Sequence, residues 1–425
     1  MNDDDGALHG KLSRGQLALL STLVALMPLS FAISWRVKLI PVAVLLLAGV
    51  GLLVANPATR RSFIHARTVI AACALALLYP LLNALGHRLG WGVLDRPSHV
   101  LLYIATAAAF SVPLRMRWVW SGFSLTAAGL GVVCIVQHDV LSIGRAYGLN
   151  GGAWGAIEFA MLLLVLSLMS LTQVLYGGGS PWQRGLHVAG AVLGMYGALL
   201  TQSRGPLLAF VPVFLLLALN YARHTGHWRR FALALVVVIC GGVLAAMSVH
   251  GVMLDRFADV GAEVASYDHR NDASGAVRER IEMWRTAGHA IADHPLAGVG
   301  IDQFGSYVRQ QVAAGHANAV IAKYDHPHSE YLEAAAAGGV PGLLVLLAVF
   351  ALPATYFARY ARHRDPTIML PALAGLTTVG MYVLCAFSDN VFYRAMPHSL
   401  YFFLVLGLAV HVGSLTPPSR PLRGV

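Results

Sequence analysis

Residues 325–342 read DHPHSEYLEAAAAGGVPG, and the predicted fold depends on what this stretch leads into. Two histidines and three carboxylates come directly before a run of alanine and glycine. An apolar segment then follows, near 338–358, which is long enough to cross a bilayer as a helix. The stretch therefore begins like a water-exposed loop and ends like the entrance to a membrane helix, which makes its histidines candidates for a site at the membrane boundary.

The composition is typical of a polytopic membrane protein. Of the 425 residues, 57% are hydrophobic and only 12% are charged, whereas soluble domains carry about 25% charged residues. We predict an all-α membrane protein of about twelve transmembrane helices with one large, partly helical loop. The expected helices lie near 16–34, 37–55, 67–86, 98–113, 118–136, 153–175, 186–201, 206–222, 231–250, 338–358, 367–387 and 397–414. The fourth and seventh are short and could tilt or break.

The distribution of lysine and arginine predicts which side of the membrane each connection faces. Successive connections between the expected helices lie on alternating sides of the membrane, so they form two sets. The connections of one set hold sixteen lysines and arginines, and the short loops of the other set hold seven. The positive-inside rule therefore places both termini in the cytoplasm. We divide the chain into helices one to nine (1–250), a large outer loop (251–337), helices ten to twelve (338–414) and a cytoplasmic tail (415–425). The formal charge of +10 then reflects orientation and anionic lipids, with no nucleic acid as a partner.

The large loop has a mixed charge and a helical pattern. In AVRERIEMWRTAGHAIADH, Ile281, Trp284, Ala287 and Ile291 lie about one turn apart, which predicts an amphipathic helix. We expect Trp284 to be a core or membrane-interface residue. The following HPLAGVGIDQF should end the helix, because it contains proline and glycine.

Several arginines are candidates for binding an anion. Arg204 in LTQSRGPLLAF and Arg145 in SIGRAYGLNGGAWG lie in outer loops between apolar helices. Each is either an interfacial arginine or a guanidinium that binds phosphate with two hydrogen bonds. Arg278, Arg280 and Arg285 in RERIEMWR are most simply a solvated helix face.

His326 and His328 are candidates for acid–base chemistry. A histidine beside Asp325 and Glu330 could be an oriented general base, since imidazole titrates near neutral pH. We expect no metal site, because the sequence contains neither HExxH nor a Cys/His pattern. In FSDNVFYRAMPH, Asp389 either forms a structural ion pair with Arg394 or contributes to the same site.

Other features exclude further classes of protein. The cysteines lie singly inside apolar runs and read as small core residues, namely Cys73, Cys134, Cys240 and Cys385. The sequence contains no GxSxG, Walker or GxGxxG motif, so an ATP-driven pump is disfavoured.

Three stretches resemble the O-antigen ligase family, whose superfamily includes O-antigen polymerases and bacterial O-oligosaccharyltransferases. The ligase signature is a histidine, then Asn, Ser or Gln, nine residues, and GxxG. His328, Ser329 and the glycines at 339 and 342 match it, whereas His326 does not fit the spacing. In SRGPLL, Arg204 precedes Leu208 by four residues, as in the family.

The third stretch is RIEMWRTAGHAIADHPLAGVGIDQF, which resembles the large periplasmic loop of the family. Arg280 and Trp284 match its arginine, three residues and tryptophan, and Pro295 to Phe304 match its PLxGxGxxxF. Arg278 competes with Arg280 for the family role, and the spacing to Trp284 favours Arg280. The topology fits as well, so the resemblance covers essentially the whole chain.

The resemblance implies a glycosyltransferase C-type-like enzyme of the bacterial inner membrane, active on the periplasmic side in lipopolysaccharide biosynthesis. It would transfer O-antigen glycan from undecaprenyl pyrophosphate to lipid A–core oligosaccharide, without metal, ATP or another cofactor. His328 would be the general base, with Arg204, Arg280 and, more weakly, Arg145 on the pyrophosphate, and inversion at the anomeric carbon. Alternatives are a polymerase or a protein O-oligosaccharyltransferase of the same superfamily, and a transporter of lipid-linked glycans.

Overall fold

The computed structural model describes residues 12–153, 155–229, 231–232, 236, 263–268 and 273–416, with only the backbone of Trp35. These residues fold into helices and loops without a β-strand, as the composition predicts. Of the ninth predicted span, 231–250, only three residues are described, and Cys240 lies outside the described ranges. The other three cysteines are buried.

The helices form where the sequence is apolar, and polar residues begin several of them. Ser13 and Ser180 accept a hydrogen bond from the third backbone N–H of their helices, which satisfies a group with no partner inside the helix. The α-helices are α1 (Arg14–Ile33), α2 (Trp35–Ala55), α3 (Pro57–His65), α4 (Arg67–Gly86), α5 (Asp95–Ala107), α6 (Met116–Ile135), α7 (Ala156–Tyr176), α8 (Pro181–Leu200), α9 (Arg204–Thr225), α12 (Ala276–Asp293), α13 (Phe304–Ala313), α14 (Glu330–Tyr360), α15 (Pro366–Cys385) and α16 (Ala395–Leu415).

In the part of the chain that the structure describes, nine helices are long and apolar enough to span a membrane. They are α1, α2, α4, α6 with its extension to Val140, α7, α9, α14, α15 and α16. The helix predicted near 98–113 divides into α5, of 13 residues, and a 3₁₀ turn at Ala108–Ser111. The helix predicted near 186–201 is continuous as α8, but its start, PWQRGLHV, is polar. The described residues are therefore all-helical with nine candidate spans, which is consistent with a polytopic membrane protein, whereas the number twelve stays a prediction.

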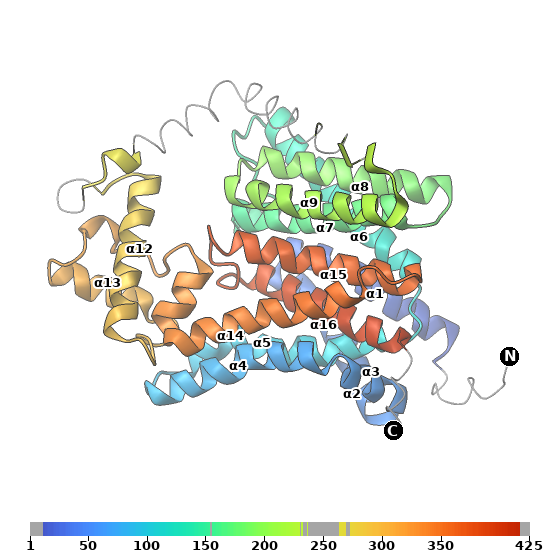
Figure 1. Cartoon of the computed structure of the whole chain (residues 1–425), viewed down its shortest axis with the longest axis horizontal. Coiled ribbons are helices and arrows are strands. Elements are labelled where there is room, and N and C mark those ends of the chain that lie inside the picture. Colours follow the sequence, from blue (N-terminus) through green and yellow to red (C-terminus); the bar gives the residue numbers. More distant parts are fainter. Residues whose placement is uncertain are drawn as a thin grey trace.

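The bundle has α14, α15 and α16 between two flanking groups of helices (Figure 1). On one side, α9 packs against α15 and α7, and α8 packs against α6 and α7. On the other side, α4 packs against α14 and α5. The side chains of α16 and α7 are almost all buried, so these two helices form the centre of the bundle.

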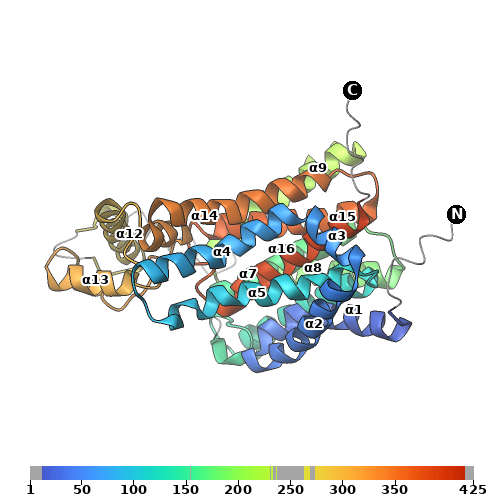
Figure 2. The ribbon, with the colours of Figure 1, turned by 90° about the horizontal axis from the view of Figure 1, so that it is seen from below.

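The helices α12 and α13 lie together at one end of the bundle, which we call the loop end (Figures 1 and 2). Their small core contains Met283, Ala287, Phe304, Val308 and Ile321. The predicted amphipathic helix is therefore confirmed as α12, and it ends at Asp293 just before the proline and glycines.

The helix α14 begins at Glu330 rather than at 338, and it kinks at Gly339, whose φ is 64°. The kink frees backbone groups that then bond to the PLAGVG segment. Val299 and Gly300 donate to the carbonyls of Ala336 and Ala337 at 2.9 and 3.0 Å, and Val340 donates to that of Pro295 at 2.8 Å. This pairing joins the large loop to the membrane helix.

Two glycines allow the backbones to approach this closely. A Cβ on Gly298 would lie 2.3 Å from the carbonyl carbon of Ala337, and one on Gly339 would lie 2.6 Å from the oxygen of Pro295. Both glycines also have positive φ, a conformation that L side chains rarely adopt. Gly298 of PLxGxG therefore packs against α14, and Gly339 of GxxG packs against the PLAGVG segment. The contact lies close in sequence to residues 325–329, which carry His326 and His328 and which we call the histidine loop.

Candidate functional site

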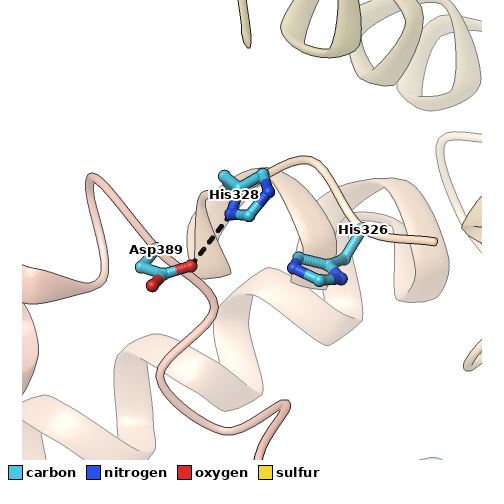
Figure 3. A group of neighbouring side chains, drawn as sticks. All are labelled: His326, His328 and Asp389. Carbon is cyan, nitrogen blue, oxygen red and sulfur yellow. Dashed lines mark hydrogen bonds and ion pairs between the residues drawn. The ribbon is translucent and has the colours of Figure 1, made fainter. Parts of the chain in front are cut away.

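His328 and Asp389 form the centre of a polar cluster at the loop end. Nδ1 of His328 lies 3.1 Å from Oδ1 of Asp389, and Figure 3 shows the imidazole pointing toward the carboxylate. His328 lies in the loop before α14, and Asp389 lies in the connection between α15 and α16. The predicted alternative in which Asp389 contributes to the histidine's site is the arrangement found.

The backbone around His328 is bound to the connection that carries Asp389. His328 has φ of 51°, which is uncommon outside glycine. The N–H of Glu330 donates to the carbonyls of Ala386 and Asp389 at 2.9 and 3.2 Å, and Ser329 is buried. These bonds anchor the chain directly after His328 on the connection that carries Asp389.

Asp389 is buried but remains ionised. Its Oδ1 accepts from the backbone N–H of Asn390 at 2.9 Å as well as facing His328. Burial alone would raise the pKa of the Asp389 carboxyl, but the hydrogen bond and charge of His328, the N–H of Asn390 and the charge of Arg280 together lower it. A negative carboxylate therefore faces Nδ1 of His328, which makes Nε2 the nitrogen that can accept a proton.

His326 completes the cluster from the same loop. Its ring centroid lies 4.6 Å from that of His328 and 4.1 Å from that of Tyr393. Burial, and then the charge of His328, lower the pKa of His326 to about 4. His326 is therefore neutral near pH 7 and is a weak base.

One ligand atom from each of His326, His328 and Asp389 could face a common metal ion. These atoms all lie within 4.8 Å of one another, and two imidazoles with a carboxylate form a donor set that Zn²⁺ accepts. The sequence predicts no metal, since these three residues have no motif spacing. The geometry makes the cluster suitable for a direct metal-removal test.

The helix α12 contacts the histidine loop through Trp284 and approaches Asp389 through Arg280. Nε1 of Trp284 donates to the carbonyl of Pro327 at 2.9 Å, and the side chain is 39% exposed. Trp284 is thus a residue that holds the histidine loop, not a core residue. Arg280, one turn earlier, lies near enough to lower the pKa of Asp389.

Arg285 has a structural role that the charge pattern did not predict. It forms an ion pair with the fully buried Glu282 at 3.0 Å and donates to the carbonyl of His316 at 2.7 Å. Burial would raise the pKa of Glu282, but hydrogen bonds from Arg285, Tyr267 and the N–H of Asn318 lower it to about 2. This network holds the loop helices together.

Arg204 and Arg145 lie on the α8–α9 side of the cluster. Arg204 begins α9, and Gly205 packs against the connection, since a Cβ there would lie 2.3 Å from Oγ of Ser388. Arg145 donates to the carbonyl of Thr201 at 2.8 Å and to Oγ of Ser203 at 3.3 Å. Arg145, from the loop before α7, thus bonds to the turn that leads into α9, and Arg204 begins that helix next to Gly205, which packs on Ser388, the residue that precedes Asp389.

Three charged residues that lie near the site in the sequence have other partners in the structure. Arg394 pairs with Glu158 at 2.5 Å and not with Asp389. Asp325 pairs with Arg309 at 3.0 Å, and Glu330 accepts from the backbone N–H of Phe392 at 3.0 Å. Neither carboxylate next to the histidines in sequence orients His328, because the chain turns away on both sides of it.

No motif in the sequence pointed to Tyr393, which contacts His326. It did give a signal for Glu158, because this carboxylate interrupts an apolar run. Through its ion pair with Arg394, Glu158 connects the centre of the bundle to the segment that carries Tyr393.

Comparisons with known proteins found a family model and a relative to which this chain is similar. The family model described as O-antigen ligase matches residues 189–347, which include Arg204, Arg280 and His328. A protein of Haemophilus influenzae, described as an uncharacterized protein, is 20% identical over 327 residues. That alignment covers 74% of this chain and 80% of the relative.

Proposed function

From membership of the O-antigen ligase superfamily, which the match over residues 189–347 supports, we propose that the protein is an O-antigen ligase. It transfers O-antigen glycan from undecaprenyl pyrophosphate to lipid A–core oligosaccharide. The observation that carries this proposal is the contact of His328 with Asp389, 3.1 Å between Nδ1 and Oδ1. A buried carboxylate behind one nitrogen of an imidazole is the arrangement of an oriented general base.

The reaction needs one proton transfer and one displacement. Nε2 of His328 takes the proton of an acceptor hydroxyl while that oxygen attacks the anomeric carbon of the glycan. The new C–O bond forms as the bond between the anomeric carbon and the pyrophosphate oxygen breaks. The lipid pyrophosphate leaves with the electron pair, and the anomeric configuration inverts. The donor is already activated, so no nucleotide is required.

The arginines stabilise the negative charge that grows on the pyrophosphate. Arg204 lies at the start of α9, Arg145 bonds to the turn that precedes it, and Arg280 lies on α12. Arg280 also lies near Asp389, so it links donor binding to the base. Guanidinium groups suit this task, because each can donate two parallel hydrogen bonds to phosphate oxygens.

The architecture fits a reaction between two lipid-anchored substrates. We assign the loop end to the periplasmic face of the inner membrane, with both termini in the cytoplasm, as the distribution of basic residues predicts. The base then lies where the sugars of the two substrates project from the outer leaflet. A glycosyltransferase C-type arrangement, with a membrane bundle under a periplasmic loop, is part of the proposal.

A reconstituted assay tests the function. Purified protein in nanodiscs is given the lipid-linked glycan together with lipid A–core, with a second lipid-linked glycan, or with a pilin protein. Sugar on lipid A–core supports the ligase. Sugar on the second lipid-linked glycan or on the pilin would instead make the protein a polymerase or an O-oligosaccharyltransferase. His328→Ala should abolish transfer, and wild-type activity in that variant would remove His328 from the mechanism.

A further inference from the structure

A separate cavity of about 180 Å³ lies at the loop end, between α4, α14, the start of α16 and the connection 390–393. Its walls are mostly apolar, as at Ala76, Val345 and Phe402. The polar groups that line it come from the first turns of α14 and α16, from the connection, and from Tyr79 of α4, Arg96 of α5 and Asp302. Pockets for drug-sized ligands measure about 300–1,000 Å³, so this cavity admits a single ring and not an oligosaccharide.

Several polar atoms of the cavity lining have no hydrogen-bond partner in the described part of the chain. They are Oε2 of Glu333, both the amide nitrogen and the amide oxygen of Asn390, and Nδ1 of His398. Asn390 is 3% exposed and His398 is 5% exposed. Burying such groups without a partner costs free energy, about 1–3 kcal/mol each. Native proteins accept that cost where a ligand or water supplies the missing bonds.

The charges of the lining indicate which ligand chemistry fits. Glu330, Glu333 and Asp302 contribute carboxyl groups, which offer hydrogen bonds to hydroxyls but no positive charge for a phosphate. The one arginine of the lining, Arg96, forms an ion pair with Asp302 at 3.5 Å, donates to the carbonyl of Tyr393 and covers the ring of Tyr393. A neutral molecule with several hydroxyl groups satisfies this set, because hydroxyls donate to carboxylates and both donate to and accept from an amide.

The cavity is lined by residues next to the candidate base, and it lies on the α4 side of the bundle and not on the α9 side. Asn390 follows Asp389 directly, and Tyr393 contacts His326. The cavity lies toward α4, whereas Arg204 begins α9, and these two helices flank α14–α16 on opposite sides (Figure 1). Asn390 and Tyr393 thus connect the cavity lining to the residues of the candidate base.

We propose that this cavity is the acceptor subsite, in which one sugar ring of the acceptor glycolipid is held by hydrogen bonds from its hydroxyls to Glu333, Asn390 and His398. This inference rests on the proposed glycosyl transfer. A direct displacement requires the attacking oxygen and the leaving pyrophosphate on opposite faces of the anomeric carbon. A sugar held on the α4 side and a pyrophosphate held by Arg204 on the α9 side would approach the anomeric carbon from opposite sides.

Two alanine variants with matched controls test the subsite. Glu333→Ala and Asn390→Ala should each raise KM for the acceptor about tenfold, which corresponds to the loss of a hydrogen bond worth about 1.4 kcal/mol. KM for the lipid-linked donor should not change. Asp365→Ala and Asn220→Ala remove the same kinds of side chain at the other end of α14–α15 and of α9, and they should leave both KM values as in wild type. Unchanged acceptor KM in the two cavity variants would overturn the subsite.

A binding measurement separates this inference from the proposed function. Binding of lipid A–core to the protein in nanodiscs, without donor, is compared for wild type, Asn390→Ala and Val345→Phe, which fills the cavity without removing a polar group. Weaker binding in both variants supports the subsite even if wild type transfers no sugar, a result that would reject only the ligase reaction. Equal binding in all three proteins shows that the cavity holds only water and rejects the subsite.

Discussion

His328 and Asp389 are 61 residues apart in the chain, and Nδ1 of the histidine lies 3.1 Å from Oδ1 of the aspartate. The contact depends on three supports: the left-handed turn at His328, the bond from Trp284 to Pro327, and the anchoring of Glu330 on Ala386. Because these supports come from different segments, the position of His328 depends on how α12 and the histidine loop pack against the α15–α16 connection.

Asp389→Asn should lower kcat for glycan transfer by roughly 10- to 100-fold, with little change in KM for either substrate. The amide keeps the shape of the carboxylate but loses the negative charge that orients and stabilises the imidazolium. His328→Ala removes the base itself and should cost about 10²–10⁴ in kcat. Initial rates with both substrates varied give these values, and a wild-type kcat for Asp389→Asn would contradict the oriented-base mechanism.

Arg280→Gln should reduce kcat/KM for the lipid-linked donor by about 100-fold, because a charged donor to phosphate is lost near the base. Arg280→Lys should restore only part of this loss, since an ammonium cannot donate two parallel bonds. Arg309→Gln is the matched control in the same loop, because it breaks an exposed ion pair with Asp325, worth at most about 1 kcal/mol. Equal effects of the Arg280 and Arg309 changes would remove Arg280 from donor binding.

Gly339→Ala should destabilise the protein by about 1–3 kcal/mol and lower its activity. The new Cβ would lie 2.6 Å from the carbonyl oxygen of Pro295 at a backbone position with φ of 64°, where an L side chain is strained. Gly288→Ala is the control, because that Cβ meets no atom within 4 Å, and alanine favours a helix by about 0.5–1 kcal/mol. Thermal unfolding in detergent compares the two, and similar melting temperatures would argue against the close packing of PLAGVG on α14.

Acid should destabilise the histidine loop through His326. In the folded protein the pKa of His326 is about 4, below the ordinary value of 6.5. Between about pH 4 and pH 6.5, the unfolded chain therefore binds a proton at this residue that the folded chain does not. Stability is therefore fully present above about pH 6.5 and is lost as the pH falls toward 4, by up to about 3 kcal/mol. His326→Gln cannot take up this proton and should lose less stability between pH 7 and 4.5. Parallel melting curves for the two proteins would show that His326 is not buried as a neutral group.

Removal of metal ions should leave transfer unchanged if arginines alone stabilise the pyrophosphate. Enzyme dialysed against EDTA is assayed with and without added Zn²⁺ or Mg²⁺. Loss of activity that only a metal restores would instead assign His326, His328 and Asp389, whose ligand atoms lie within 4.8 Å, to a metal centre. Metal analysis of the purified protein provides an independent readout.

Much of the fold could be predicted because membrane helices are determined locally. A run of about 20 apolar residues forms a helix in a bilayer whatever its neighbours are, and the described helices follow those runs. The start of α14 at Glu330 could not be predicted in this way. Its first turns carry glutamates and alanines, and they become helical because they pack against α12 and the PLAGVG segment.

Local sequence determined the class of the protein, the amphipathic α12 and the motif spacing that distinguishes His328 from His326, because each depends on residues within a few turns of one another. The tertiary structure alone decided that Asp389, and not Asp325 or Glu330, faces His328. It also decided that Arg394 pairs with Glu158 and that unpartnered polar groups line a cavity beside the base. These are contacts between distant segments, and they depend on how α7, α14 and the α15–α16 connection meet, which no periodicity within a single helix specifies.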